Sequence, residues 1–157
     1  MTSEKLRLAI VVSQFNEEIS NRLLNGAQTY LENDSGFQTE ITVYWVPGAF
    51  EIPFACQQVI DKTDIDAVIA LGSVVKGGTP HFDFVAGECI RGIQKVSLSS
   101  NTPISLGVLT TDTYEQALER SDSNYVDHDG SSGDKGSSAA EAAITMALLA
   151  RSLAGEN

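Results

Sequence analysis

Four short apolar runs recur along this chain, with segments of helical spacing between them. The runs cover residues 6–13, 38–46, 67–74 and 104–109. The first and third are almost continuously apolar, which is typical of parallel strands that are covered on both faces. The second is rich in β-branched and aromatic residues, which favour strands. Each run therefore predicts one strand of a buried sheet.

The segments between and after these runs predict helices. Apolar residues at three- and four-residue intervals run through residues 17–31, 52–60, 82–96 and 137–153. Asn16 is expected to cap the first of these helices, because asparagine is a preferred residue at a helix start. Thr113 and Gln116 have the spacing of a capping box, which predicts a further short helix that ends at Arg120.

Strands that alternate with helices imply a parallel sheet with right-handed crossovers. A length of 157 residues suggests one domain, so we expect a single unit over residues 1–157. The expected architecture is α/β: a flavodoxin-like, three-layer α/β/α sandwich around a four-stranded parallel sheet. Residues 121–136 are polar and rich in Gly, Ser and Asp, and a loop of that length usually has a function.

Composition narrows the class of partners. The formal net charge of -11 argues against nucleic acid and against anionic membranes. Cys56 and Cys89 lie in apolar helical patterns and are expected to be buried, without the spacing of metal ligands. No apolar run is long enough for a membrane span, and the start lacks the apolar region of a signal peptide. We therefore expect a cytoplasmic protein without a metal.

Candidate functional residues follow the ends of the predicted strands, where open α/β sheets bind ligands. Phe15 follows the first strand, Glu51 the second, and Thr110-Thr111-Asp112 the fourth. The third strand leads into Lys76-Gly77-Gly78-Thr79-Pro80-His81 at the start of a helix. The glycines let the backbone approach a ligand, free N–H groups at a helix start attract anions, and a histidine moves protons near neutral pH. This stretch predicts a phosphate site with acid–base chemistry.

Each candidate also has a purely structural interpretation. Phe15 could belong to the core, and Glu51 could be a charge that suits a helix N-terminus. His81 could cap or support its own helix. Arg120 could serve only as a cation at a helix C-terminus, and Lys135 could be a solvated loop charge. These alternatives stay open from the residue pattern alone.

Four motifs, taken in order, resemble one family. They are Ser13-Gln14-Phe15-Asn16, Val46-Pro47-Gly48-Ala49-Phe50-Glu51-Ile52-Pro53, Gly77-Gly78-Thr79-Pro80-His81-Phe82-Asp83, and Gly107 to Ala117 with Thr110-Thr111-Asp112-Thr113 at its centre. Together they span nearly the whole chain and resemble lumazine synthase (6,7-dimethyl-8-ribityllumazine synthase). The resemblance implies a transferase of riboflavin biosynthesis. It would condense 5-amino-6-(D-ribitylamino)uracil with 3,4-dihydroxy-2-butanone 4-phosphate to give 6,7-dimethyl-8-ribityllumazine, phosphate and water, without a cofactor.

The resemblance also implies roles for individual residues. His81 would transfer protons. The substrates would be held by Phe15, Ala49, Phe50, Glu51, Ser73, Val74, Val75, Gly78, Thr79, Leu106, Arg120 and Lys135. Within this set, Phe15 would stack on the pyrimidine, and Gly78, Thr79 and Arg120 would hold the phosphate.

The resemblance further implies a homopentamer, or a multiple of pentamers, with active sites between subunits. Leu106, Arg120 and Lys135 would then come from the neighbouring chain. Residues 121–133 form a longer segment than in many members, which resembles the members that do not form shells. We therefore expect a free pentamer or a decamer.

Two substitutions depart from the family pattern. Leu106 stands where a phenylalanine is usual, and Lys76 stands where arginine is frequent. Leu106 favours an alternative function, a non-catalytic pentamer that binds a flavin or a lumazine. A generic phosphate-binding α/β protein is a weaker alternative, because the Phe15 and Glu51 motifs argue against it.

Overall fold

A parallel sheet forms the centre of the computed structural model, which describes residues 5–126, 129–130 and 133–155. Its strands are β1 (Leu6–Ser13), β2 (Thr39–Val46), β3 (Ala67–Val75) and β4 (Ile104–Thr111). They lie in the order β2-β1-β3-β4, and every neighbouring pair is parallel. The predicted four-stranded parallel sheet is confirmed. The strand order reverses between β1 and β3, which is where open sheets of this kind bind ligands.

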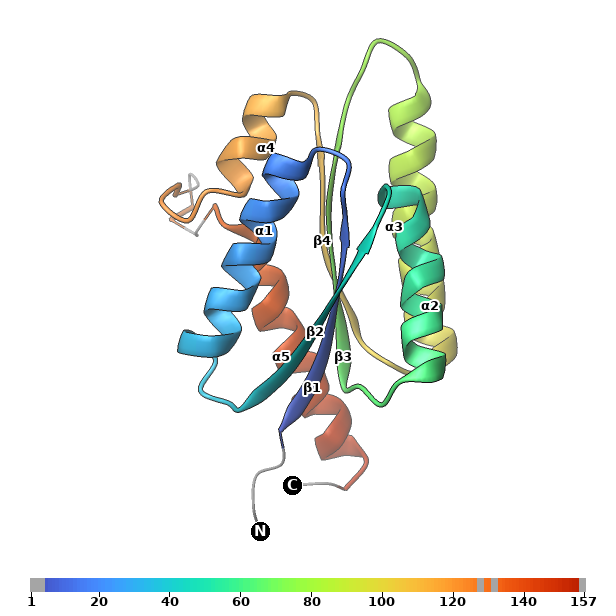
Figure 1. Ribbon diagram of the computed structural model, residues 1–157, viewed down its shortest axis with the longest axis vertical. Coiled ribbons are helices and arrows are strands. Elements are labelled where there is room, and N and C mark those ends of the chain that lie inside the picture. Colours follow the sequence, from blue (N-terminus) through green and yellow to red (C-terminus); the bar gives the residue numbers. More distant parts are fainter. Residues whose placement is uncertain (1–4, 127–128, 131–132, 156–157) are drawn as a thin grey trace.

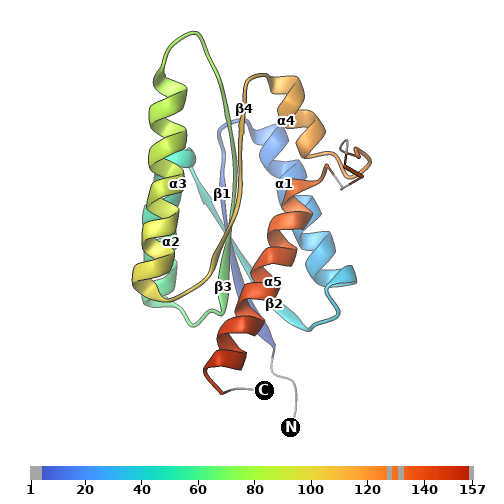
Figure 2. The same cartoon turned by 180° about the vertical axis from the view of Figure 1, so that it is seen from behind.

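Helices cover both faces of the sheet (Figures 1 and 2). One layer holds α1 (Glu17–Thr29), α4 (Tyr114–Arg120) and α5 (Lys135–Leu153). The other holds α2 (Ile52–Lys62) and α3 (His81–Ser100). A π-helical turn, Tyr30–Asp34, extends α1, and a 3-10 turn, Ala49–Glu51, precedes α2. The predicted three-layer sandwich is confirmed, and no helix of the described ranges is long and apolar enough to cross a membrane.

The sheet separates two hydrophobic cores. Alternate residues of β1 point into each of them: Leu8, Ile10 and Val12 pack with α1 and α5, whereas Ala9 and Val11 pack with α2 and α3. All five side chains are almost fully buried. A strand that is buried on both faces needs apolar residues at every position, which explains the continuous apolar run in the sequence.

The two cysteines are part of the second core, as predicted. Cys56 on α2 and Cys89 on α3 are free and buried. Burial raises the pKa of the Cys56 thiol to about 12, with a smaller contribution from Cys89. Burial also raises the pKa of the Cys89 thiol to about 11. Both thiols therefore stay protonated at neutral pH and act as small apolar side chains rather than nucleophiles.

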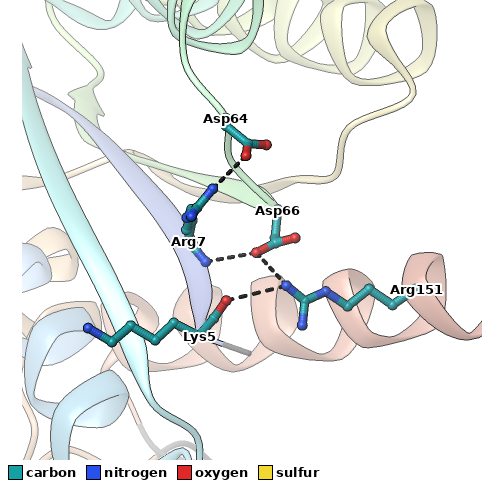
Figure 3. Close-up of polar contacts among 5 residues, drawn as sticks. All are labelled: Lys5, Arg7, Asp64, Asp66 and Arg151. Atoms are coloured by element: carbon teal, nitrogen blue, oxygen red, sulfur yellow. Dashed lines mark hydrogen bonds and ion pairs between the residues drawn. The ribbon is translucent and has the colours of Figure 1, made fainter. Parts of the chain in front are cut away.

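A polar cluster ties α5 to the amino end of the sheet (Figure 3). The Arg151 guanidinium donates to the Asp66 carboxylate at 3.0 Å and to the Lys5 carbonyl at 3.3 Å. The same Asp66 oxygen accepts from the Arg7 backbone N–H at 2.8 Å, and the Arg7 side chain pairs with Asp64. The Arg151–Asp66 pair is mostly shielded from water, so it is worth more than an exposed pair. It anchors the end of the fold opposite to the carboxyl ends of the strands.

Three expectations about helix starts can be compared with the structure. Thr113 and Gln116 form the predicted capping box. Asn16 does precede α1, but it has a left-handed backbone (φ 60°, ψ 53°) and its side chain does not cap the helix. Lys135 is not a loop residue: it is the first residue of α5, and the Asp134 side chain caps that helix. Parts of the polar loop, residues 127–128 and 131–132, lie outside the described residues.

Candidate functional site

A cleft of about 730 Å³ opens at the carboxyl end of the sheet. Its walls come from the β1–α1 turn, the β2–α2 connection, the end of β3 and the first turns of α3. It is lined by Phe15, Gly48, Ala49, Phe50, Glu51, Ser73, Val74, Val75, Gly77, Thr79, His81, Phe82, Phe84, Val85 and Glu88. Residues from three of the four predicted strand ends thus meet at one place, whereas Thr110, Thr111 and Asp112 at the end of β4 do not line it.

The β1–α1 turn presents Phe15 to the cleft. Backbone N–H groups hold this turn, since Gln14 donates to the Val46 carbonyl at 2.8 Å and Phe15 donates to the Pro47 carbonyl at 3.1 Å. The Phe15 ring is 71% exposed, so its interpretation as a core residue is wrong. A fixed, exposed ring on a cleft wall offers a flat apolar face on which a planar ligand can stack.

The β2–α2 connection contributes a carboxylate to the same cleft. The Glu51 backbone N–H donates to the Gly48 carbonyl at 3.2 Å, which closes a short 3-10 turn. Glu51 occupies the N-cap position of α2, yet its side chain makes no cap hydrogen bond. Its charge therefore suits the helix N-terminus, as the structural interpretation expects, but no hydrogen bond to the helix holds the carboxylate. It is exposed at the cleft, next to the exposed Phe50 ring and the buried Ala49.

The β3–α3 loop is open where its glycines lie. Neither Gly77 nor Gly78 has a positive φ, and a Cβ added at either position would meet nothing within 4 Å. The fold itself therefore does not require glycine at these two positions, whereas the close approach of a ligand to the backbone would. The following helix α3 begins at His81 without a side-chain cap. Its first N–H groups suit an anion.

One face of α3 forms the opposite wall. Phe84, Val85 and Glu88 stand three, four and seven residues after His81, so all four side chains lie along one helical stripe. Four residues of this wall are not among the site residues expected from the sequence: Phe82, Phe84, Val85 and Glu88. Counting helical positions from His81 could have found the last three. They give the cleft an apolar wall with a carboxylate at its far end, where Glu88 also pairs with Arg91.

Four of the predicted site residues do not line this cleft. Leu106 is half-exposed on the edge strand β4. Arg120 ends α4 and Lys135 begins α5, and these helices cover the opposite face of the sheet from α2 and α3 (Figure 1). Gly78 lies in the loop between Gly77 and Thr79, which both line the cleft. Among the described residues, the cleft of one chain is therefore lined by aromatic rings, two carboxylates and the histidine, but by no arginine.

This arrangement supports three kinds of chemistry. Phe15 can stack on a flat ring, the loop and the start of α3 can hold an anion, and His81 can exchange protons with a bound group. Among the described residues, no group of three or more His, Cys, Asp or Glu side chains could hold a metal ion. The cleft can thus take a planar group and an anion side by side.

Comparison with known families gives a match over nearly the whole chain. A family model described as 6,7-dimethyl-8-ribityllumazine synthase matches residues 5–151. The matched range includes all four strands and every residue that lines the cleft. The resemblance drawn from the four motifs is confirmed.

Proposed function

Because this chain belongs to the 6,7-dimethyl-8-ribityllumazine synthase family, whose members are transferases of riboflavin biosynthesis, we propose a specific reaction for it. The protein condenses 5-amino-6-(D-ribitylamino)uracil with 3,4-dihydroxy-2-butanone 4-phosphate. The products are 6,7-dimethyl-8-ribityllumazine, phosphate and water. The observation that carries the proposal is the meeting of Phe15, Glu51 and His81 around one cleft.

The pyrimidine binds against Phe15 and the end of β3. Stacking on the exposed Phe15 ring holds its plane. Ala49, Phe50 and Glu51 bind the ribityl chain and the pyrimidine edge, and Ser73, Val74 and Val75 form the other side.

The phosphate of the second substrate binds at the β3–α3 loop. Gly78 and Thr79 donate from the backbone and the hydroxyl, and the α3 N-terminus adds its positive end. The open space around Gly77 and Gly78 is consistent with a ligand at this position. Arg120 and Lys135 of a neighbouring chain complete the anion site, since in one chain they lie across the sheet from it.

His81 transfers protons during the condensation. Imine formation, loss of phosphate and ring closure each move protons between nitrogen, oxygen and carbon atoms. An imidazole at the mouth of the cleft serves as both donor and acceptor. Holding the two substrates side by side contributes as well, because alignment alone lowers such barriers. The proposed reaction requires no cofactor.

The exposed aromatic residues support a homopentamer with sites between subunits. Phe15, Phe50, Phe54 and Phe84 are each more than 60% exposed, and Leu106 is 50% exposed. Apolar surface of this extent is typical of a binding or assembly face.

The proposal places the protein in the cytoplasm, because two free cysteines suit a reducing compartment.

Subunit mixing tests the composite site. Co-expressed His81→Ala and Arg120→Ala chains should regain about a quarter of the wild-type sites, because each site then draws its cleft and its arginine from different chains. Co-expressed His81→Ala and Phe15→Ala chains are the control and should regain none, since both residues belong to one cleft. Equal activity in the two mixtures would exclude a site shared between chains.

Sedimentation of the same samples should give particles of five or ten chains, and a sixty-chain particle would contradict the expected assembly.

A non-catalytic flavin- or lumazine-binding pentamer is the second candidate, because Leu106 leaves one aromatic wall missing. Mixing purified protein with both substrates separates the two functions. The enzyme should speed the appearance of lumazine absorbance and fluorescence well above the spontaneous reaction. A binding protein would change the fluorescence of added lumazine but leave the rate of its formation unchanged.

A further inference from the structure

We propose that Asn16 is a positioning residue, which fixes the turn that carries Phe15 against the end of β3. The expected effect on ligand binding rests on the proposed function. The contact that holds the turn against β3, called the brace below, can be tested without any substrate. It assigns to Asn16 a task other than the helix cap that its sequence position predicts.

The conformation of Asn16 is unusual for a helix-capping asparagine. A capping side chain accepts a hydrogen bond from the helix while the backbone is extended. Asn16 instead has φ 60° and ψ 53°, and its side chain makes no cap hydrogen bond. Among the described residues that are not glycine, only Asn16 and Asn101 have a positive φ. Asparagine tolerates this region better than most residues. A different contact must therefore account for its side chain.

That contact is a hydrogen bond to β3. Asn16 Nδ2 donates to the Ser73 carbonyl at 3.0 Å, in a partly buried position. The pairing of β1 with β3 ends at Val12 and Leu71, so this bond joins the two chain segments beyond their last paired residues. The Asn16 amide thus supplies a donor to a backbone carbonyl that the neighbouring strand no longer reaches.

The bond braces the turn from its second side. On the β2 side, the backbone N–H of Phe15 already donates to the Pro47 carbonyl. On the β3 side, the Asn16 amide makes the corresponding connection. Asn16 does not line the cleft, whereas Phe15 and Ser73 both do. Its effect on a ligand must therefore pass through the relative position of the Phe15 ring and the Ser73 segment.

Asn16→Gly isolates the brace, because glycine adopts a left-handed backbone without strain and lacks the amide. Asn101→Gly is the matched control: it removes the other left-handed asparagine (φ 56°), which ends α3 at the opposite end of the sheet. Without substrate, hydrogen–deuterium exchange of the backbone amides of residues 14–15 should speed up about 3–10-fold in Asn16→Gly, the effect of one lost hydrogen bond. Asn101→Gly should leave this segment as in the wild type. Unchanged exchange in Asn16→Gly would overturn the brace, whether or not the protein is an enzyme.

Calorimetric binding of 5-amino-6-(D-ribitylamino)uracil tests the consequence. Affinity should fall about 3–10-fold in Asn16→Gly but stay unchanged in Asn101→Gly. In a Phe15→Ala background, Asn16→Gly should change affinity by less than about twofold, because the residue through which it acts is gone. The same loss in both backgrounds would show that Asn16 does not act through Phe15. A wild-type protein that binds neither substrate would refute the proposed function, while the exchange measurement still decides the brace.

Discussion

Replacement of His81 by alanine should slow lumazine formation by on the order of 10–100-fold and leave the fold and assembly intact. His81 is exposed at the first residue of α3, so its truncation removes little packing. The expected loss lies at or below the bottom of the usual range of about 10²–10⁴-fold for a general acid–base group. The cleft is open to water, and water can carry part of the proton transfer. Steady-state rates with both substrates at saturation measure the effect.

Asp83→Ala is the matched control for that variant. Asp83 lies in the same first turn of α3 and is exposed, but it does not line the cleft. Its turnover should stay within about twofold of the wild type, because it touches no reacting group. Two results would assign His81 a structural role instead: failure of His81→Ala to form the wild-type oligomer, or equal slowing by both variants.

The layers of the fold could be predicted because they depend on local patterns. Continuous apolar runs indicate strands with two covered faces, and β1 is buried on both. The strand order β2-β1-β3-β4 does not follow from such patterns. It depends on the side of β1 on which β3 pairs, a choice made by long-range packing. The flavodoxin-like architecture that the sequence predicts does imply this order, but the apolar pattern of the strands alone does not.

The site could be predicted only as far as strand ends indicate it. Phe15, Glu51 and His81 follow strands and meet in the cleft, whereas Phe84 and Glu88 sit inside a helix, away from any strand end. The cap predicted for Asn16 is wrong because a tertiary hydrogen bond to Ser73 replaces the local one. Without the family resemblance, the sequence also does not indicate which chain supplies a residue to the site.

The start of α5 shows a further kind of error. Gly and Ser near Lys135 suggest a loop, but Asp134 accepts hydrogen bonds from Gly136 and Ser137 and starts the helix there. Burial raises the pKa of the Asp134 carboxyl above its usual range, against the lowering effect of these two N–H groups. Its contribution to stability is therefore greatest at acid pH and falls as pH rises through the native pKa. The Asp134 side chain still caps the start of α5, although burial of its charged form is unfavourable.

Among replacements of the described glycines by alanine, Gly136→Ala should destabilise the protein most. It should lower the free energy of unfolding by about 3 kcal/mol or more. An added Cβ would lie 2.1 Å from the Leu23 carbonyl oxygen and 2.8 Å from the Leu23 Cα. Both are backbone atoms of α1, so no side-chain rotation can relieve the clash. The helices α1 and α5 must separate, which opens the core that they share with β1. Urea unfolding measures the loss.

Gly87→Ala is the control that separates a clash from a general effect of glycine in helices. Gly87 lies inside α3, and an added Cβ there would meet nothing within 4 Å. Alanine favours the helix over glycine by about 0.5–1 kcal/mol, so this variant should be more stable than the wild type. Both substitutions add one methyl group to a helix. The changes in the free energy of unfolding should have opposite signs, because Gly136 lies against the backbone of another helix and Gly87 does not. Changes of equal sign and size would show that the α1–α5 contact yields without cost.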